Sequence, residues 1–244
     1  WHAGVHRLQC REIWGGYEAV DAAISVPGID AWVLSRPYQD EQGGGDIHYA
    51  GLCGHGVLSR FVVADIAGHG AAVREVARSF RELMSEHMNV PDESGLVRGI
   101  NRRFAELGPE GQFATAVVMT YVATLDHLIA VNAGHPRPLW YSAAAGQWRL
   151  MWHRVSGSVE GVMNLPLGVV EQTGYRQFAV PLGRGDLVVV YTDGLAEARD
   201  SCGGQLGEQG LLAIARKLDA ARPERLNHDL VEAATAFQGG QPLA

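Results

Sequence analysis

The sequence predicts an α+β domain in which antiparallel strands form the middle and helices lie outside them. Apolar runs of strand length occupy residues 31–64 and 113–191, an amphipathic helical pair separates them at 71–107, and two helical stretches end the chain. Strands on both sides of a central helical pair, with further helices at the end, are typical of layered α+β domains. The 244 residues, 47% of them hydrophobic, can bury a sizeable core in a single domain.

The first strands are predicted from short apolar runs bounded by turn residues. Residues 31–35 form one candidate strand. Residues 47–53 and 58–64 form a hairpin around the Gly54-His55-Gly56 turn. Residues 1–30 carry turn signals but no strand or helix that the pattern defines.

Two helices are predicted after residue 70, because apolar residues recur there with helical spacing. The first, over 71–88, carries arginine and glutamate on its opposite face, and the second ends at Gly108-Pro109. The apolar positions are Val73, Val76, Ala77, Phe80, Leu83, Met84, Leu96, Val97, Ile100, Phe104 and Leu107. We expect both helices to cover a sheet with these faces.

The second half of the chain returns to strand-like runs. We expect strands at 113–124, 128–132, 139–141, 148–152, 175–180 and 186–191, followed by helices at 207–218 and 223–237. The strands at 175–180 and 186–191 are predicted to pair with each other around Gly183-Arg184-Gly185.

The charge balance argues against nucleic acid as a partner. Twenty Lys and Arg against 27 Asp and Glu give a net charge of −7. Neutralisation of phosphates by basic side chains drives nucleic-acid binding, so a mildly acidic chain without a basic stripe is a poor DNA or RNA binder. The longest weakly polar run, 113–125, is too short to cross a bilayer.

The three cysteines, Cys10, Cys53 and Cys202, indicate a reducing compartment. They are far apart and odd in number, which argues against a disulfide framework or a zinc site. We therefore expect a cytoplasmic location. The chain begins Trp1-His2 without an initiator Met or a signal peptide, so we interpret it as a piece of a longer protein, which membrane segments elsewhere could anchor.

Three aspartates share one local design. Asp46 follows three glycines and opens a strand, Asp65 ends the apolar run 61–64, and Asp193 ends the apolar run 187–192. A strand holds such a carboxylate in place, and a neighbouring glycine lets a ligand approach. Oxygen ligands without a His/Cys cluster favour Mg²⁺ or Mn²⁺ over zinc. The alternative is that each aspartate is simply a turn residue.

The histidines near glycines have two interpretations. His69 lies between glycines at a helix start, where backbone N–H groups favour anions, so it is either a phosphate contact or a turn residue. His55 is expected to be exposed in its turn. For His135, in Asn132–Pro136, we favour a structural role with the ring hydrogen-bonded to backbone. The sequence contains no GxSxG, P-loop or GxGxxG pattern.

Together these segments resemble the PPM-type metal-dependent protein phosphatases, in the bacterial branch that includes SpoIIE-like and RsbU-like proteins. The resemblance covers about residues 31–240, and the order of four short motifs makes it specific. The motifs are Gly44-Gly45-Asp46, Phe61-Val62-Val63-Ala64-Asp65-Ile66-Ala67-Gly68-His69-Gly70, Asn132-Ala133-Gly134-His135-Pro136, and Gly185-Asp186 through Tyr191-Thr192-Asp193-Gly194-Leu195-Ala196-Glu197-Ala198.

The resemblance implies a four-layer α-β-β-α sandwich of two antiparallel sheets flanked by helices. It also implies two Mn²⁺ or Mg²⁺ ions at one edge, with Asp65 bridging both ions. Asp46 and the backbone carbonyl of Ile66 would complete one site, and Asp193 would bind the other ion. The implied reaction is hydrolysis of phosphoserine or phosphothreonine by a metal-activated water. His69 would contact the substrate.

Two departures from the family pattern bear on activity. The family usually ends in a strand with two consecutive aspartates, one of which ligates metal, and this chain stops at Ala244 where that strand should begin. No arginine matches the one that holds phosphate in eukaryotic relatives. We therefore expect a phosphatase domain over 31–244 that lacks its final strand, with 1–30 as an extension. The alternative is a catalytically weak or inactive pseudophosphatase that acts as a signalling module.

The partners implied by the resemblance belong to bacterial signal transduction. The expected substrate is a regulatory phosphoprotein, such as a small anti-sigma-factor antagonist. An attached or separate sensor domain is expected to regulate the phosphatase. A homodimer through the helices at 71–107 stays open, although amphipathic stripes of this kind usually face a core.

Overall fold

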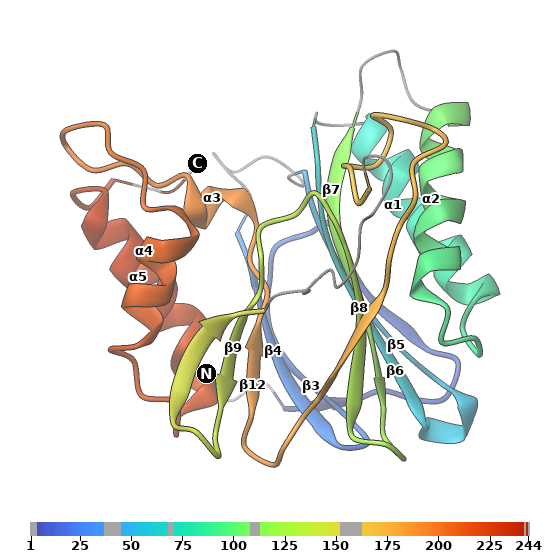
Figure 1. Cartoon of the computed structure of the whole chain (residues 1–244), viewed down its shortest axis with the longest axis horizontal. Coiled ribbons are helices and arrows are strands. Elements are labelled where there is room, and N and C mark those ends of the chain that lie inside the picture. Colours follow the sequence, from blue (N-terminus) through green and yellow to red (C-terminus); the bar gives the residue numbers. More distant parts are fainter. Residues whose placement is uncertain are drawn as a thin grey trace.

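The structure is a computed structural model that describes residues 4–36, 45–67, 71–107, 113–151, 163–241 and 243. Its elements form four layers, with helices on both outer sides and strands in the two middle layers (Figure 1). The predicted α-β-β-α sandwich is therefore confirmed. None of the helices in these described ranges is both long and apolar enough to cross a membrane.

One middle layer is a continuous six-stranded antiparallel sheet in the order β11-β8-β7-β6-β5-β2. Its two longest strands run side by side over nine register pairs. The strands are β2 (Ile13–Gly16), β5 (Asp46–Cys53), β6 (Leu58–Ile66), β7 (Ala114–Val122), β8 (His127–Ala133) and β11 (Phe178–Pro181). The predicted hairpin is β5 and β6, and His55 in its turn is exposed as expected.

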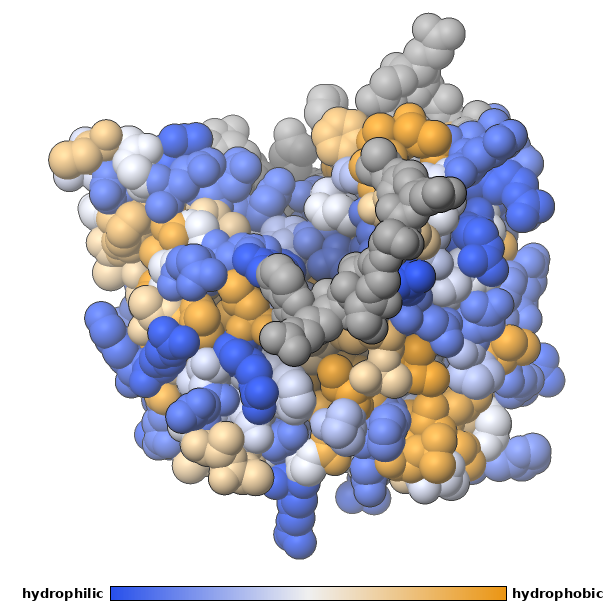
Figure 2. All heavy atoms as spheres, viewed as in Figure 1, coloured by the Kyte–Doolittle hydropathy of each residue, from blue (hydrophilic) through white to orange (hydrophobic). Residues whose placement is uncertain are grey.

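Helices α1 (Ala71–Glu86) and α2 (Glu93–Leu107) cover the outer face of this sheet (Figure 1). Their predicted apolar faces are confirmed, because Phe80 and Leu96 are fully buried against sheet residues such as Val62 and Val118. Figure 2 shows that the outer side of the two helices is mostly hydrophilic. Burial of one apolar stripe against the sheet therefore accounts for both helices.

The other middle layer consists of two separate three-stranded sheets, in the orders β1-β3-β4 and β10-β9-β12. Helices α4 (Gly207–Ala215) and α5 (Leu226–Phe237) lie outside this layer (Figure 1). The strands are β1 (His6–Arg7), β3 (Val20–Val26), β4 (Ile29–Ser35), β9 (Leu139–Ser142), β10 (Gln147–Leu150) and β12 (Leu187–Val189), and the short helical turns are η2 (Gly54–Gly56), α3 (Asp193–Ala196) and η3 (Pro223–Arg225). Three of these strands, β1, β3 and β4, include residues before 31, as does β2 of the larger sheet.

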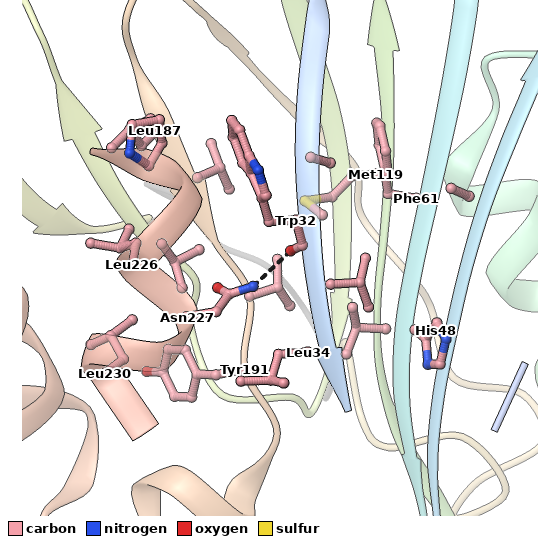
Figure 3. A pocket seen from close by; sticks show the side chains of 18 of the residues that line it. Trp32, Leu34, His48, Phe61, Met119, Leu187, Tyr191, Leu226, Asn227 and Leu230 are labelled. Carbon is pink, nitrogen blue, oxygen red and sulfur yellow. Dashed lines mark hydrogen bonds between the residues drawn. The ribbon is translucent and has the colours of Figure 1, made fainter. Parts of the chain in front are cut away.

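A cleft of about 1570 Å³ separates the two small sheets. Strands β4 and β12 both line it, and within the described ranges each of them pairs with a strand on one side only. Figure 3 shows Trp32 and Leu34 of β4 facing Leu226 and Leu230 of α5 across this space. The side chain of Asn227 donates a hydrogen bond to the Trp32 carbonyl at 2.8 Å. The second layer therefore has a cleft where the first layer has a continuous sheet.

The predicted pairing of residues 175–180 with 186–191 is wrong. Strand β11 pairs with β8 in the six-stranded sheet, whereas β12 pairs with β9 in the other layer. The turn between them explains the difference, because Asp186 accepts hydrogen bonds from the backbone N–H groups of Gly183 and Ala143 and from the Trp140 indole. These contacts tie the turn to the β9–β10 hairpin, so the chain crosses between layers there.

Candidate metal and active site

Asp46 and Asp65 lie side by side at one end of the six-stranded sheet. Asp46 opens β5 and Asp65 is the penultimate residue of β6, and the two are direct partners in the antiparallel register. Side chains opposite each other on neighbouring strands have Cβ atoms about 5 Å apart. The strand pairing alone therefore brings two carboxylates together.

Asp193 reaches the same place from the other layer. It is the first residue of α3, just after β12, at the upper end of the sandwich in Figure 1. Its carboxyl group shares a hydrogen bond with that of Asp65. The preceding residue, Thr192, donates a hydrogen bond from Oγ1 to Asp46 Oδ2 at 3.0 Å. The structure thus brings Asp46, Asp65 and Asp193 together.

Burial and mutual repulsion raise the pKa values of two of these carboxyl groups. Burial raises the pKa of Asp46 to about 6, with a smaller contribution from the charge of Asp193, and the Thr192 hydroxyl acts in the opposite direction. Burial raises the pKa of Asp65 to about 7, and the charges of Asp193 and Asp46 add to this effect. The cluster therefore holds a proton near neutral pH unless another positive charge takes its place.

The donor set fits a hard divalent cation in its chemistry. All the side-chain donors are oxygens, and a cation would relieve the repulsion that raises the pKa values. Within the described residues, however, no group of three or more His, Cys, Asp or Glu side chains is already arranged to hold a metal ion. Asp65 and Asp193 share a hydrogen bond, so the proton between them must leave before both carboxylates can bind an ion.

Glu197 is a neighbouring acidic residue that the sequence analysis did not single out. Its charge contributes to the raised pKa of Asp65. It lies four residues after Asp193, and its backbone N–H bonds the Asp193 carbonyl at 2.7 Å, so one helical turn joins the two residues. Residues four apart on a helix are neighbours on one face, so the spacing of Asp193 and Glu197 in the sequence could have indicated that the two acidic side chains lie close together.

The remaining predicted site residues have different outcomes. Ile66 ends β6 next to Asp65, is buried, and its backbone N–H bonds the Gly45 carbonyl at 3.0 Å. The metal-binding role of its carbonyl stays a prediction. His69, the predicted substrate contact, lies outside the described residues, as does Gly44 of the first motif.

His135 lies in a turn that its neighbours hold tightly. The Asn132 side chain accepts a hydrogen bond from the His135 N–H and donates one to the His135 carbonyl, both at 2.8 Å. Gly134 has a φ of +68°, and a Cβ there would come within 2.5 Å of Pro166. This turn aims the imidazole of His135 into the protein, where burial lowers its pKa to about 4.

The His135 ring contacts a side chain as well as the backbone that we expected it to contact. Nδ1 lies 2.7 Å from Oγ1 of Thr115, a side chain that the sequence analysis did not assign to the site. The backbone of Tyr191 also interacts with the ring. His135 is 5% exposed and uncharged at neutral pH, which agrees with a structural role.

Comparison with known protein families gives one match that covers most of the chain. The family model described as Stage II sporulation protein E (SpoIIE) matches residues 58–243. This range contains Asp65, Ile66, His135 and Asp193.

Several solved structures share the fold. The RsbU and RsbW domains of a Mycobacterium tuberculosis protein match with a TM-score of 0.64 and 27% identity, over 82% of this chain and 53% of that chain. The PP2C phosphatase domain of SpoIIE from Bacillus subtilis, with a fragment of its regulatory domain, matches with a TM-score of 0.63 and 15% identity, over 94% of this chain and 60% of that chain.

A third match is RsbX in complex with magnesium, with a TM-score of 0.63 and 14% identity, over 91% of this chain and 94% of that chain. The present chain spans about half to three fifths of the length of the first two solved structures, which contain further domains. The family model therefore gives the family of this chain, and the solved structures independently support its fold.

Proposed function

Because the chain belongs to the SpoIIE family of PP2C-type phosphatases, we propose that it is a metal-dependent protein phosphatase that hydrolyses phosphoserine or phosphothreonine in a regulatory protein. The observation that carries this proposal is the meeting of Asp46, Asp65 and Asp193 at one end of the sandwich. Three carboxylates from both layers meet there, and burial and repulsion raise the pKa values of Asp46 and Asp65, so a divalent cation would stabilise the site.

Asp65 has the central place in this site. It neighbours Asp46 across the β5–β6 pairing and Asp193 through a hydrogen bond, so we propose that it bridges two Mn²⁺ or Mg²⁺ ions. Asp46 and the Ile66 carbonyl would complete one ion's ligands, and Asp193 would bind the other ion. When bound, such ions lower the pKa of water and neutralise charge on a phosphoryl group.

Two hydrogen bonds determine how the carboxylates of this site can bind an ion. The Thr192 hydroxyl holds Oδ2 of Asp46, which fixes the orientation of that carboxylate between the layers. The proton in the Asp65–Asp193 hydrogen bond must leave before both groups can act as ligands. We also propose that His69, two positions before α1, contacts the substrate phosphate.

Two solved structures of this class support the partners that we propose. One of these structures contains RsbU and RsbW domains in one chain, and another includes a fragment of a regulatory domain. We propose a small anti-sigma-factor antagonist as the phosphoprotein substrate, an attached or separate sensor domain as the regulator, and no nucleic acid. The three cysteines are free thiols, which supports a cytoplasmic location.

We propose that residues 31–244 form the phosphatase domain without its final strand, and that β2 and β3 of the preceding segment complete its sheets. The cleft between β4 and β12 supports the missing strand, because a strand placed there would pair with the edges of β4 and β12 that have no partner among the described residues, and it would join the two small sheets. A second candidate function is favoured by the present arrangement of the side chains, since no group of three or more His, Cys, Asp or Glu among the described residues is arranged to hold an ion. In that case the chain is a pseudophosphatase that binds a partner without turnover.

The test is hydrolysis of p-nitrophenyl phosphate with and without Mn²⁺. We expect Mn²⁺-dependent turnover that D65N and D193N each reduce by at least 10²-fold, an estimate based on the loss of a metal that neutralises charge on the phosphoryl group. The matched control D219N removes a carboxylate at an exposed turn near α4, where Asp219 accepts a hydrogen bond only from a backbone N–H. Metal-dependent turnover that survives both site substitutions would exclude the proposed active site. Tight Mn²⁺ binding without turnover would support the pseudophosphatase.

A further inference from the structure

The His135 ring lies between the two middle layers of the sandwich. The residue follows β8 of the six-stranded sheet and precedes β9 of the other layer. Its Nδ1 lies 2.7 Å from Oγ1 of Thr115 on β7, and its ring also interacts with the backbone of Tyr191, which follows β12. The ring therefore contacts both layers at one point.

Both contacts lead directly to candidate metal ligands. Thr115 is the register partner of Asp65 in the β6–β7 pairing. Tyr191 is followed by Thr192, which holds Asp46, and then by Asp193, which bonds Asp65. A shift of the ring would change the distance between the strand that carries Asp65 and the segment that carries Asp193.

The turn that carries His135 is built to keep the ring in place. The Asn132 side chain donates one hydrogen bond to the His135 carbonyl and accepts one from the His135 N–H, and Pro166 packs against Gly134. The ring is 5% exposed, and its other nitrogen, Nε2, is buried without a side-chain partner. Such a clamped ring fixes a distance better than a side chain that rotates freely.

We propose that His135 and Thr115 are positioning residues that set the spacing of Asp65 and Asp193 across the two layers and thereby the affinity of the site for divalent cations. This inference rests on the proposed function, because it assigns a role toward the proposed cations. Neither residue needs to touch a cation or the substrate. Partners behind the ligands commonly change metal affinity by 10- to 100-fold when they are removed.

The chain offers a matched control on the same strand. Thr120 lies five residues after Thr115 on β7, about 17 Å away at 3.4 Å per residue, and its Oγ1 accepts a hydrogen bond from Arg60 Nε at 3.0 Å. T115V and T120V make the same chemical change, and each removes one hydrogen bond between side chains. Only T115V acts next to Asp65.

The experiment measures Mn²⁺ binding by isothermal titration calorimetry for wild type, H135Q, T115V, T115S and T120V, together with the melting temperature of each variant without metal. We expect H135Q and T115V to raise the Kd for Mn²⁺ about 10-fold or more. T115S keeps the hydroxyl and should bind like wild type, and T120V should change the Kd by less than twofold although it lowers the melting temperature.

Equal changes of Kd in T115V and T120V would overturn the proposal, because the effect would then follow general destabilisation. Wild-type Kd in both H135Q and T115V would also overturn it. Failure of the proposed function looks different: wild type itself would then bind Mn²⁺ no better than D65N. A double-mutant cycle on the melting temperature of the metal-free H135Q/T115V protein tests the contact itself, and additive losses would contradict it.

Discussion

The two middle layers of this protein differ in how completely they are built. The six-stranded sheet is continuous, and helices α1 and α2 bury one of its faces with side chains such as Phe80 and Leu96. The other layer is divided into two three-stranded sheets by a cleft of about 1570 Å³. Asp46 and Asp65 belong to the continuous layer and Asp193 to the divided one. The site thus lies between a layer with a continuous sheet and a layer that contains a cleft.

The largest expected effect of this difference is on core packing. F80A removes a fully buried side chain between α1 and the six-stranded sheet, so we expect a loss of about 3–5 kcal/mol in the free energy of unfolding. L34A, on the half-buried β4 strand beside the cleft, should cost only about 1 kcal/mol. Urea denaturation of both variants measures the contrast, and equal losses would show that the second layer is packed as tightly as the first.

Two ion pairs allow a similar comparison. Arg60 pairs with Glu93 at 2.8 Å with side chains 6% and 0% exposed, whereas Arg137 pairs with Glu208 with side chains 34% and 26% exposed. R60M leaves a buried carboxylate without its partner, so we expect a loss of about 3–5 kcal/mol. R137M should cost about 1 kcal/mol, because water reaches that pair. Denaturation in low and high salt should show that salt changes the loss of stability caused by R137M but not the loss caused by R60M.

The pH dependence of stability tests whether His135 is buried as a neutral ring between the two layers. Burial lowers the pKa of His135 to about 4, so between that value and the ordinary value of 6.5 the unfolded chain binds a proton that the folded protein does not. This contribution to stability is complete above pH 6.5 and is lost as the pH falls toward 4. Relative to H135Q, wild type should lose about 2 kcal/mol between pH 7 and pH 5. A constant difference between the two proteins over this range would contradict the burial of a neutral ring.

The elements that the sequence predicted correctly depend on local patterns. The helix over 71–86 follows from apolar residues at helical spacing, and the β5–β6 hairpin from two apolar runs around a glycine turn. The partners of β11 and β12 could not be predicted in this way. They depend on contacts of Asp186 with Trp140 and Ala143, which are more than 40 residues away in the chain.

The candidate site shows the same limit. The three aspartates were found because each follows a strand-like run or opens a strand beside glycine, and because the family resemblance orders them. Thr115 and Thr192 have no such signal, since a threonine in a strand or directly before a helix is ordinary. Only the pairing of β7 with β6 and the approach of the two layers show that these hydroxyl groups lie beside the carboxylates.

The central claim is that carboxylates from the two layers form one cation site. Calorimetric titration of wild type, D46N, D65N and D193N with Mn²⁺ tests it most directly. The account predicts that each of the three substitutions weakens Mn²⁺ binding at least tenfold, because each removes an oxygen ligand from the same cluster. Undiminished binding in D193N, the variant altered in the divided layer, would show that the two layers do not share a cation.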